Sequence, residues 1–304
     1  MTPNAQHGSE LGRFLRARRG RVAPGDVGLP VGTGLRRTPG LRREELASLA
    51  GVSVDYYVRI EQGKETRPSP SVLNSLARVL RLDDTEHEYL RQLVARATGQ
   101  TPPAREVLSR SVSPTVHLLL ESLRPFPAHV IGRTGDVLAH NPAGLRLLAG
   151  LERWQAPQRN IARYVFLHPA ARDLFPDWGR QAQEMVGFLR AFAGTDPDAP
   201  DLAPVAGELL VKSPEFARMW ERYDVRGHSR GRKMFQHPDA GELTLSYQVM
   251  KLLGTPGQHL ITYVAEPATP EHDKIVLLDM LAAQGKAETV TPSSSQAAQD
   301  GNQQ

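Results

Sequence analysis

The feature that most constrains the fold of this chain is a short segment in which Gly51 separates two small apolar stripes. The residues that form these stripes are Leu46, Leu49, Val52, Tyr57 and Ile60. Their spacing predicts two short helices that share one core. Helices that cross steeply need a small residue where they touch, here Ala47, and a residue that tolerates positive φ at the turn, here Gly51. Ser53 supplies a side-chain oxygen to cap the second helix. The segment therefore predicts a helix-turn-helix.

The second helix of this pair has a face that its core does not use. The residues on that face are Val54, Asp55, Tyr56, Val58 and Arg59. A helix presented in this way fits the major groove of duplex DNA, where the base edges differ in their pattern of donors and acceptors.

Positive charge is concentrated around this segment. Residues 1–81 hold 14 Lys and Arg against 7 Asp and Glu, a net charge of +7, whereas the whole chain carries +4 and the remainder therefore carries −3. Such asymmetry is typical of a module that binds a polyanion, because each neutralised phosphate releases counterions. By charge alone, a solvated basic face explains it equally well.

The rest of the N-terminal third predicts more helices and one long loop. Leu11, Phe14 and Leu15 predict a first helix, and residues 22–40 hold five glycines and three prolines, too many for regular structure. Ser69-Pro70, and Asp83 with Glu86, are start signals for two later helices. We expect an all-α domain over residues 9–98, followed by a hinge at residues 99–103.

The C-terminal part changes to the period of β-strands. Residues 128–131 and 137–140 predict two strands, with Asn141 capping a helix after them. Three more strands are expected at residues 232–237, 242–252 and 259–266. Polar residues alternate with apolar ones in the second of these three, so the sheet has one apolar face. Two strands, a helical middle and a three-strand meander is the order of a PAS-like α+β domain with an antiparallel sheet. We expect this domain over residues 104–268, and a disordered tail over residues 284–304.

Both parts of the chain resemble known families. Residues 47–63 resemble the Cro/repressor-type (XRE) helix-turn-helix through Ala47, Gly51-Val52-Ser53, Ile60-Glu61 and Gly63. Roughly residues 9–267 resemble the MmyB-like regulators. The residues that carry this second resemblance are the Gly/Pro-rich loop before Arg42-Arg43-Glu44-Glu45-Leu46-Ala47, Asn160-x-x-Arg163-x-x-Phe166, Trp220 with Asp224-Val225-Arg226, His237-Pro238 with Gly241, and Tyr263.

The first resemblance implies a transcription regulator that reads double-stranded DNA. The positions that it implies for base contacts are Val54, Asp55 and Arg59, and those for phosphate contacts are Arg43, Lys64 and Arg67. We also expect base contacts from the neighbouring Ser53 and Tyr56, and a phosphate contact from Arg42. Asp55 departs from the long polar amides often found at its position, and either accepts from cytosine N4 or sets the helix angle by repelling the backbone. Because one recognition helix reads few base pairs, we expect a homodimer on a two-fold-related site.

The second resemblance implies a domain that binds a small apolar, fatty-acid-like ligand. A pocket for an amphiphile needs apolar walls and a cation or a few donors at its end. Arg163 is the expected cation because its segment is otherwise apolar, although its guanidinium could instead extend to water. The other expected ligand residues are Asn141, Trp220, Arg226, His237 and Tyr247. For Trp220 a core position, and for His237 a hydrogen-bonded structural role, are the alternatives. Tyr223 stands where the family usually has a histidine.

Other functions have less support. The chain has no cysteine, and its ten histidines show no metal-binding spacing, so we expect neither a metal nor a cofactor. Gly227-His228-Ser229-Arg230-Gly231 matches a nucleophile elbow, but a helix exit and a strand flank it, so an esterase using Ser229 is the weakest alternative. The other alternative is a C-terminal domain that only mediates dimerisation or binds a protein partner. Without a membrane-spanning run or a secretory signal, a cytoplasmic protein is expected.

Overall fold

The computed structural model describes residues 9–30, 40–65, 67–98, 110–195, 199–222 and 230–290. The chain packs as two compact units. The first unit combines residues 1–107 with residues 165–167 and 179–228. The second unit combines residues 108–164, 168–178 and 229–304. The units therefore do not coincide with two consecutive stretches of sequence.

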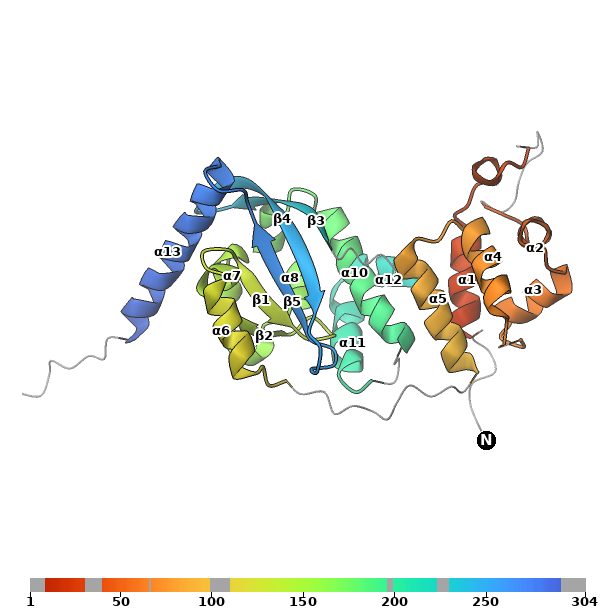
Figure 1. Ribbon diagram of the computed structural model, residues 1–304, viewed down its shortest axis with the longest axis horizontal. Helices are drawn as coiled ribbons and strands as arrows, with labels where there is room; N and C mark the ends of the chain where they lie inside the picture. Colours follow the sequence, from red (N-terminus) through yellow and green to blue (C-terminus); the bar gives the residue numbers. More distant parts are fainter. Residues whose placement is uncertain are drawn as a thin grey trace, which may run out of the picture. The chain divides into compact units, whose positions relative to one another are not determined.

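The N-terminal part of the first unit is all helical, as predicted. Its helices are α1 (Glu10–Arg19), α2 (Arg43–Ala50), α3 (Val54–Glu61), α4 (Pro70–Val79) and α5 (Asp84–Ala97), with a 3-10 turn η1 (Pro24–Val27) after α1 (Figure 1). Buried residues from all five helices form one core that includes Phe14, Leu46, Tyr57, Leu76 and Leu90. The predicted loop over residues 22–40 contains η1, and residues 31–39 of that loop lie outside the described part of the chain.

Local signals in the sequence account for how α2 and α3 are joined. Gly51 ends α2 with φ of 70°, a conformation that glycine adopts without strain. Ser53 begins α3, and its Oγ accepts a hydrogen bond from the backbone N–H of Tyr56 at 3.2 Å. A Cβ added at Gly12 would lie 2.0 Å from the carbonyl oxygen of Glu61, so glycine at this position lets α1 approach α3. The helix-turn-helix that the sequence predicts is present.

The second unit contains a five-stranded antiparallel sheet in the order β2-β1-β5-β4-β3. Its strands are β1 (Ala128–Ile131), β2 (Val137–His140), β3 (Arg230–His237), β4 (Gly241–Lys251) and β5 (His259–Val264). The predicted strands are confirmed, with ends that differ by at most two residues. Together with the helices described next, they make the α+β fold class that the sequence predicts.

The helices before, between and after the strands are divided between the two units. In the second unit lie α6 (Pro114–Ser122), α7 (Pro142–Leu147), α9 (Ala170–Leu174), α13 (Pro270–Val290), and the 3-10 turns η2 (Leu151–Arg153) and η3 (Ala156–Gln158). Helices α10 (Trp178–Thr195), α11 (Leu202–Lys212) and α12 (Pro214–Glu221) pack in the first unit, apart from Trp178. Helix α8 (Ile161–Leu167) contributes residues 161–164 to the second unit and 165–167 to the first.

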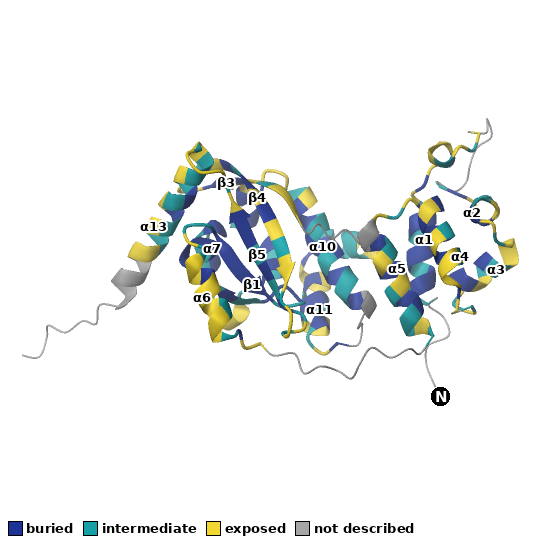
Figure 2. Ribbon diagram, viewed as in Figure 1, coloured by how far each residue is buried: buried dark blue, intermediate teal, exposed yellow. Residues whose placement is uncertain are grey.

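The sheet has two different faces, as its alternation predicts. Phe235, Leu245 and Tyr263 are buried on one face, which we call the inner face, and the register of the strands places Tyr247 opposite Tyr263. On the other face, which we call the outer face, Ser246 and Gln248 of β4 are exposed. Along the middle of this strand, successive residues alternate between buried and more exposed (Figure 2). Next to β1, this outer face is covered by α6, whose Leu120 joins a separate cluster with Val130 and Leu260.

The C-terminal segment corrects one prediction. The disordered tail was expected from residue 284, but α13 continues to Val290. Residues 284–290 include Gln284, Lys286, Ala287 and Glu288, which favour helix more than the composition of the whole tail indicates. Residues 291–304 lie outside the described part of the chain. Among the described helices, none combines the length and the apolar character needed to cross a membrane.

Candidate functional site

Helix α3 presents most of the predicted base-facing residues to solvent. Ser53, Val54, Asp55 and Arg59 are exposed, and Tyr56 is half-buried. The Arg59 guanidinium lies 3.8 Å from a carboxylate oxygen of Glu65 and is 59% exposed, so the ion pair leaves it accessible. The face of α3 that its core does not use is therefore rich in side chains able to donate or accept hydrogen bonds.

The four predicted phosphate-contacting residues fall into two groups. Arg42, Lys64 and Arg67 are exposed, at the start of α2 and after the end of α3. Arg43 differs from them, because its Nε donates to Oε2 of Glu61 at 2.6 Å. Its side chain is 41% exposed, so part of its guanidinium still faces solvent.

Glu61, which was named only as part of the helix-turn-helix resemblance, has a structural role that was not expected. Its carboxylate is fully buried and accepts hydrogen bonds from Arg19 Nε at 3.0 Å, Arg43 Nε at 2.6 Å and Tyr57 Oη at 3.2 Å. Burial, and then the nearby Glu61 carboxylate, raise the pKa of Tyr57, so its hydroxyl remains a donor. These contacts join α1, α2 and α3 and fix the exposed face of α3. An acidic residue four positions after the core residue Tyr57, on the same side of the helix, was the available signal.

In the second unit, a row of aromatic rings runs from α8 across the inner face of the sheet. Tyr164 lies 6.5 Å from Phe175, Phe175 lies 5.6 Å from Phe235, and Phe235 lies 5.6 Å from Tyr263, between ring centroids. Tyr263 in turn lies 6.2 Å from Tyr247. The inner face is therefore largely apolar, with the hydroxyls of tyrosines along it.

His129 of β1 is an unusual polar residue on this inner face. It is 2% exposed, its ring lies 5.9 Å from that of Tyr263, and its Nδ1 is buried without a hydrogen-bond partner among the described residues. Burial, aided by the positive charges of His140 and Lys233, lowers its pKa to about 3. At neutral pH it is a neutral imidazole with unused hydrogen-bonding capacity. Its place in an expected strand follows from the sequence, but no sequence signal marks it as a site residue.

Comparison with protein families agrees with both parts of this geometry. Residues 10–90 match the model of a helix-turn-helix domain. Residues 112–278, more than half of the chain, match the model of the MmyB-like transcription regulator ligand binding domain. The chain belongs to the MmyB-like transcription regulators. It is a DNA-binding regulator with a C-terminal ligand-binding domain. A comparison with curated proteins found no match.

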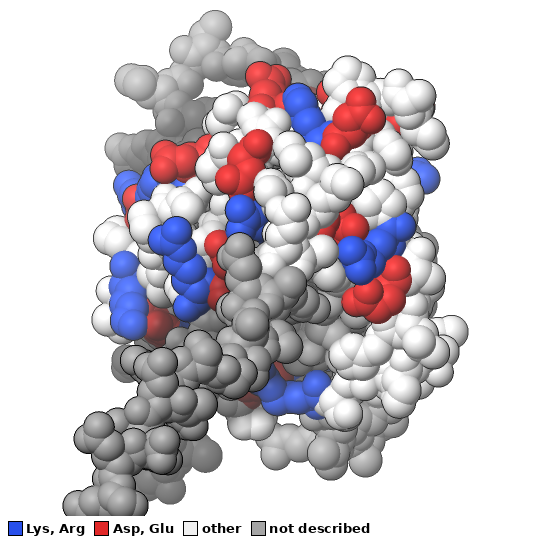
Figure 3. Space-filling model, turned by 90° about the vertical axis from the view of Figure 1, so that its left-hand side faces the viewer, with Lys and Arg blue, Asp and Glu red and all other residues white. Residues whose placement is uncertain are grey.

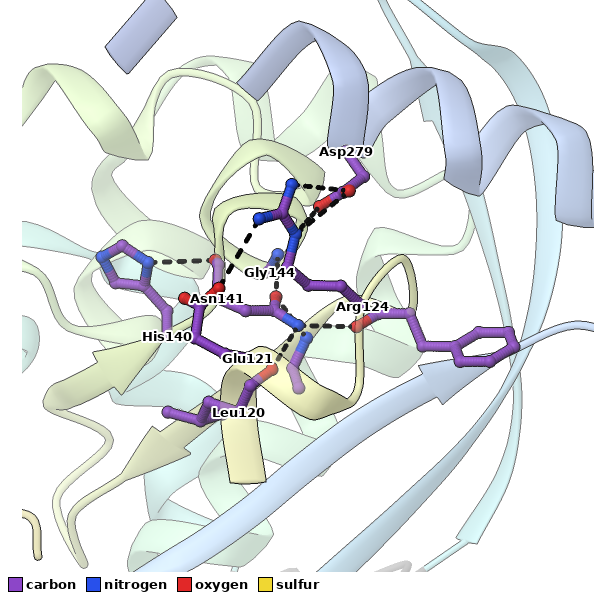
Figure 4. A network of polar contacts seen from close by, with 9 residues as sticks. Leu120, Glu121, Arg124, His140, Asn141, Gly144 and Asp279 are labelled. Carbon is purple, nitrogen blue, oxygen red and sulfur yellow. Dashed lines mark hydrogen bonds and ion pairs between the residues drawn. The ribbon is translucent and has the colours of Figure 1, made fainter. Parts of the chain in front are cut away.

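In this MmyB-like regulator, Asn141 is fully occupied by the fold. Its Oδ1 accepts from the backbone N–H groups of Gly144 at 2.8 Å and Ala128 at 3.0 Å, and its Nδ2 donates to the carbonyls of Phe126 at 2.8 Å and Leu120 at 3.1 Å. Figure 4 shows the side chain at the centre of these contacts, with the ion pair of Arg124 and Asp279 beside it. Both donors and both lone pairs are used within the fold, so no polar atom of Asn141 remains for a ligand.

His237 is likewise engaged by backbone groups. It is buried, its Nε2 lies 2.9 Å from the carbonyl oxygen of Arg146, and its Nδ1 lies 3.1 Å from the backbone nitrogen of Asp239. Burial lowers its pKa, so the neutral ring donates through one nitrogen and accepts through the other. This arrangement fits the structural alternative, because both ring nitrogens of His237 are engaged by the backbone.

The other predicted ligand residues lie in different places. Arg163 is half-buried on α8, next to Tyr164, and its backbone N–H donates to the capping residue Asn160 at 3.0 Å. Tyr247 is buried on the inner face, where Lys233 Nζ lies 4.9 Å from its ring centroid. Trp220 is half-buried on α12, in the first unit. Arg226, Tyr223 and Ser229 lie outside the described residues.

Charges on one face of the regulator are mixed. On the face shown in Figure 3, Lys and Arg side chains alternate with Asp and Glu, and neither sign forms a continuous patch. No cluster of metal-ligating side chains occurs within the described ranges.

Proposed function

We propose that this protein is a cytoplasmic, homodimeric regulator that reads its operator with α3 and responds to a fatty-acid-like ligand held on the inner face of the sheet. A ligand that prefers one arrangement of the dimer would change the spacing of the two recognition helices and so shift the population that binds the operator. The buried, ring-lined inner face is the observation that carries the ligand part of this proposal.

The DNA part rests on α3 and its surroundings. The Glu61 network fixes the helix from inside, while Val54, Asp55 and Arg59 remain accessible outside. Arg59 presents a fork of donors that suits a guanine edge, whereas Lys64 and Arg67 are exposed cations at the end of the helix, where a phosphate would lie.

Arg59→Ala is expected to reduce the preference for operator over random duplex at a cost of about 1–3 kcal/mol, because a base contact carries sequence information. Arg67→Ala should weaken binding to both duplexes about equally and lower the slope of log affinity against log salt by about one. Fluorescence anisotropy over a range of salt concentrations measures both quantities. Arg43 is unsuitable for this comparison, because it also holds Glu61. An unchanged slope in Arg67→Ala would show that Arg67 does not contact a phosphate.

The ligand part rests on the composition of the inner face. Leu245, Tyr247 and Tyr263 offer apolar contact area, and His129 offers a neutral group without a partner for its Nδ1. Arg163, on the helix whose Tyr164 begins the row of rings, is the cation assigned to a carboxylate head group. Small-molecule sites are typically lined in this way, mostly by apolar groups with a few polar ones.

Arg163→Met should weaken binding of dodecanoic acid far more than binding of 1-dodecanol. The substitution removes the cation and keeps most of the side-chain length, and a charge-assisted hydrogen bond contributes about 1.5–3 kcal/mol, or roughly tenfold to a hundredfold in affinity. Calorimetric titration of both ligands into parent and variant measures the difference, with a thermal melt to verify folding. Equal losses for acid and alcohol would remove Arg163 as the head-group partner. Absence of binding to the parent would contradict the fatty-acid assignment itself.

One observation favours a second candidate, a sheet that mediates dimerisation or binds a protein. Met234, Met250 and Val264 are 47%, 37% and 37% exposed and lie on the outer face of the sheet. Exposed apolar residues that share one face are typical of interaction surfaces. Organic extraction and mass spectrometry of the purified protein distinguish the two candidates, because only the first requires a bound small molecule.

A further inference from the structure

Helices α10, α11 and α12 belong by sequence to the ligand-binding domain, yet they pack with the DNA-binding helices. The family match that covers them runs over residues 112–278, whereas the first unit takes in residues 179–228 together with residues 1–107. Ala191 of α10 packs against the hydrophobic core of α1–α5. This packing joins part of the ligand-binding domain to the DNA-binding helices, and it includes one well-defined polar contact.

Arg190 of α10 makes that contact. Its side chain is 6% exposed, and its Nη1 lies 3.2 Å from Oε1 of Glu10, the first residue of α1. The guanidinium lies 4.0 Å from the ring centroid of Trp220 in α12 and also donates to the Trp220 carbonyl oxygen. Phe216 stacks on Trp220 at 5.2 Å, and Arg13 forms a second ion pair with Glu10. A planar guanidinium is suited to pairing with a carboxylate and stacking on a ring at the same time.

The surroundings of Arg190 make this contact important. A cavity of about 650 Å³ adjoins it, lined by Glu10 and Arg13 of α1 and by Leu202, Ala206 and Leu210 of α11. Because this space separates part of α1 from α11, apolar packing between them is limited there. Among the described residues, a second polar contact lies at an exposed position just after α1, where Arg21 donates to the carbonyl oxygen of Arg222. The ion pair between the buried Arg190 and Glu10, whose side chain is 21% exposed, is the less exposed of these two contacts.

We propose that Arg190 is a positioning residue that holds α1 against α10–α12, so that these three helices move with the DNA-binding helices as one body. The division across which a ligand signal passes then lies within the ligand-binding domain, between its sheet and α10–α12. This inference goes beyond the proposed function and does not depend on the chemistry of the ligand.

Amide hydrogen exchange of the full chain tests the role of Arg190. In Arg190→Met, exchange in α1 should become about tenfold faster or more, because charge-assisted hydrogen bonds are lost, while exchange in β4 and β5 stays at the parental rate. Arg190→Lys should restore part of the protection. Arg180→Met, which removes an exposed arginine paired with Glu184 within the same helix, is the control and should leave α1 unchanged. Parental exchange of α1 in Arg190→Met, or equal acceleration throughout the sheet, would overturn the proposal.

Distance measurements test the common motion directly. Because the chain has no cysteine, spin labels can be placed at two introduced cysteines, replacing the exposed Arg16 of α1 and Val211 of α11, which is 86% exposed. We expect a narrow distribution of distances between these two labels in the parent protein. The distribution should be broader in Arg190→Met but not in Arg180→Met. A second pair joins Val211 to Leu253, which is 93% exposed in the turn between β4 and β5. If that pair is the narrower in the parent, α11 moves with the sheet and the proposal is wrong.

Discussion

Glu61→Ala is expected to lower the unfolding free energy of the DNA-binding helices by about 3–5 kcal/mol and to abolish operator binding. Removing one partner of a buried ion pair leaves the other charge buried without compensation. Here the remaining charge is that of Arg19, which is 8% exposed. The loss is a large fraction of the 5–15 kcal/mol by which a domain is usually stable. Urea unfolding, monitored by amide exchange in α3, measures this loss of unfolding free energy.

Two further variants make this result interpretable. Glu61→Gln keeps an acceptor for Tyr57 and Arg19 but not the negative charge, so its loss should be smaller than that of Glu61→Ala. Glu88→Ala removes an exposed carboxylate of α5 that pairs with Arg91, and should change the unfolding free energy by less than about 1 kcal/mol. Equal stability of Glu61→Ala and Glu88→Ala would contradict a structural role for the buried network.

The second large effect is the response of the ligand-binding domain to acid. Burial holds the pKa of His129 at about 3 in the folded protein, below the ordinary value of 6.5. Between these pH values the unfolded chain binds a proton at this position and the folded chain does not, so stability is lost as the pH falls from about 6.5 towards 3. The contribution of one such group reaches about 1.4 kcal/mol for each pH unit.

His129→Leu should therefore flatten the dependence of unfolding free energy on pH between about 6.5 and 4. Some dependence should remain, because burial also lowers the pKa of His168, His237 and His259. Urea unfolding at a series of pH values, followed by amide exchange of β1 and β5, measures the slope. His117→Leu, at an exposed position of α6, is the control. If His129→Leu keeps the slope of the parent, His129 is not the source of the acid sensitivity.

Sequence reasoning worked best where a residue acts on its neighbours along the chain. Gly51, Ser53 and the pair Asp83 and Glu86 act within a few residues of themselves, and the structure has the turn and caps that they predict. Strand alternation in the same way predicted the inner and outer faces of the sheet. These signals are local, so they can be recognised without knowledge of which segments meet in space.

Contacts between distant segments could not be predicted in this way. Glu61 meets Arg19 across 42 residues, and Arg190 meets Glu10 across 180. Nothing in the sequence near either carboxylate identifies its partner. Asn141 and His237 were expected at the ligand for a related reason. Some of the backbone groups that occupy their polar atoms, such as the carbonyls of Leu120 and Arg146, come from elements that only the fold brings together.

The strand order of the sheet also bears on how the domain is made during synthesis. Strand β5 lies between β1 and β4, although β1 begins at residue 128 and β5 at residue 259. The hairpin of β1 and β2 can form soon after it leaves the ribosome, but the edge of β1 that β5 will pair with stays open until more than a hundred further residues have been translated. Pairings between such distant segments form slowly, and an unpaired strand edge invites association with other chains. The sheet is thus most exposed to misassembly in the interval before the last strand arrives.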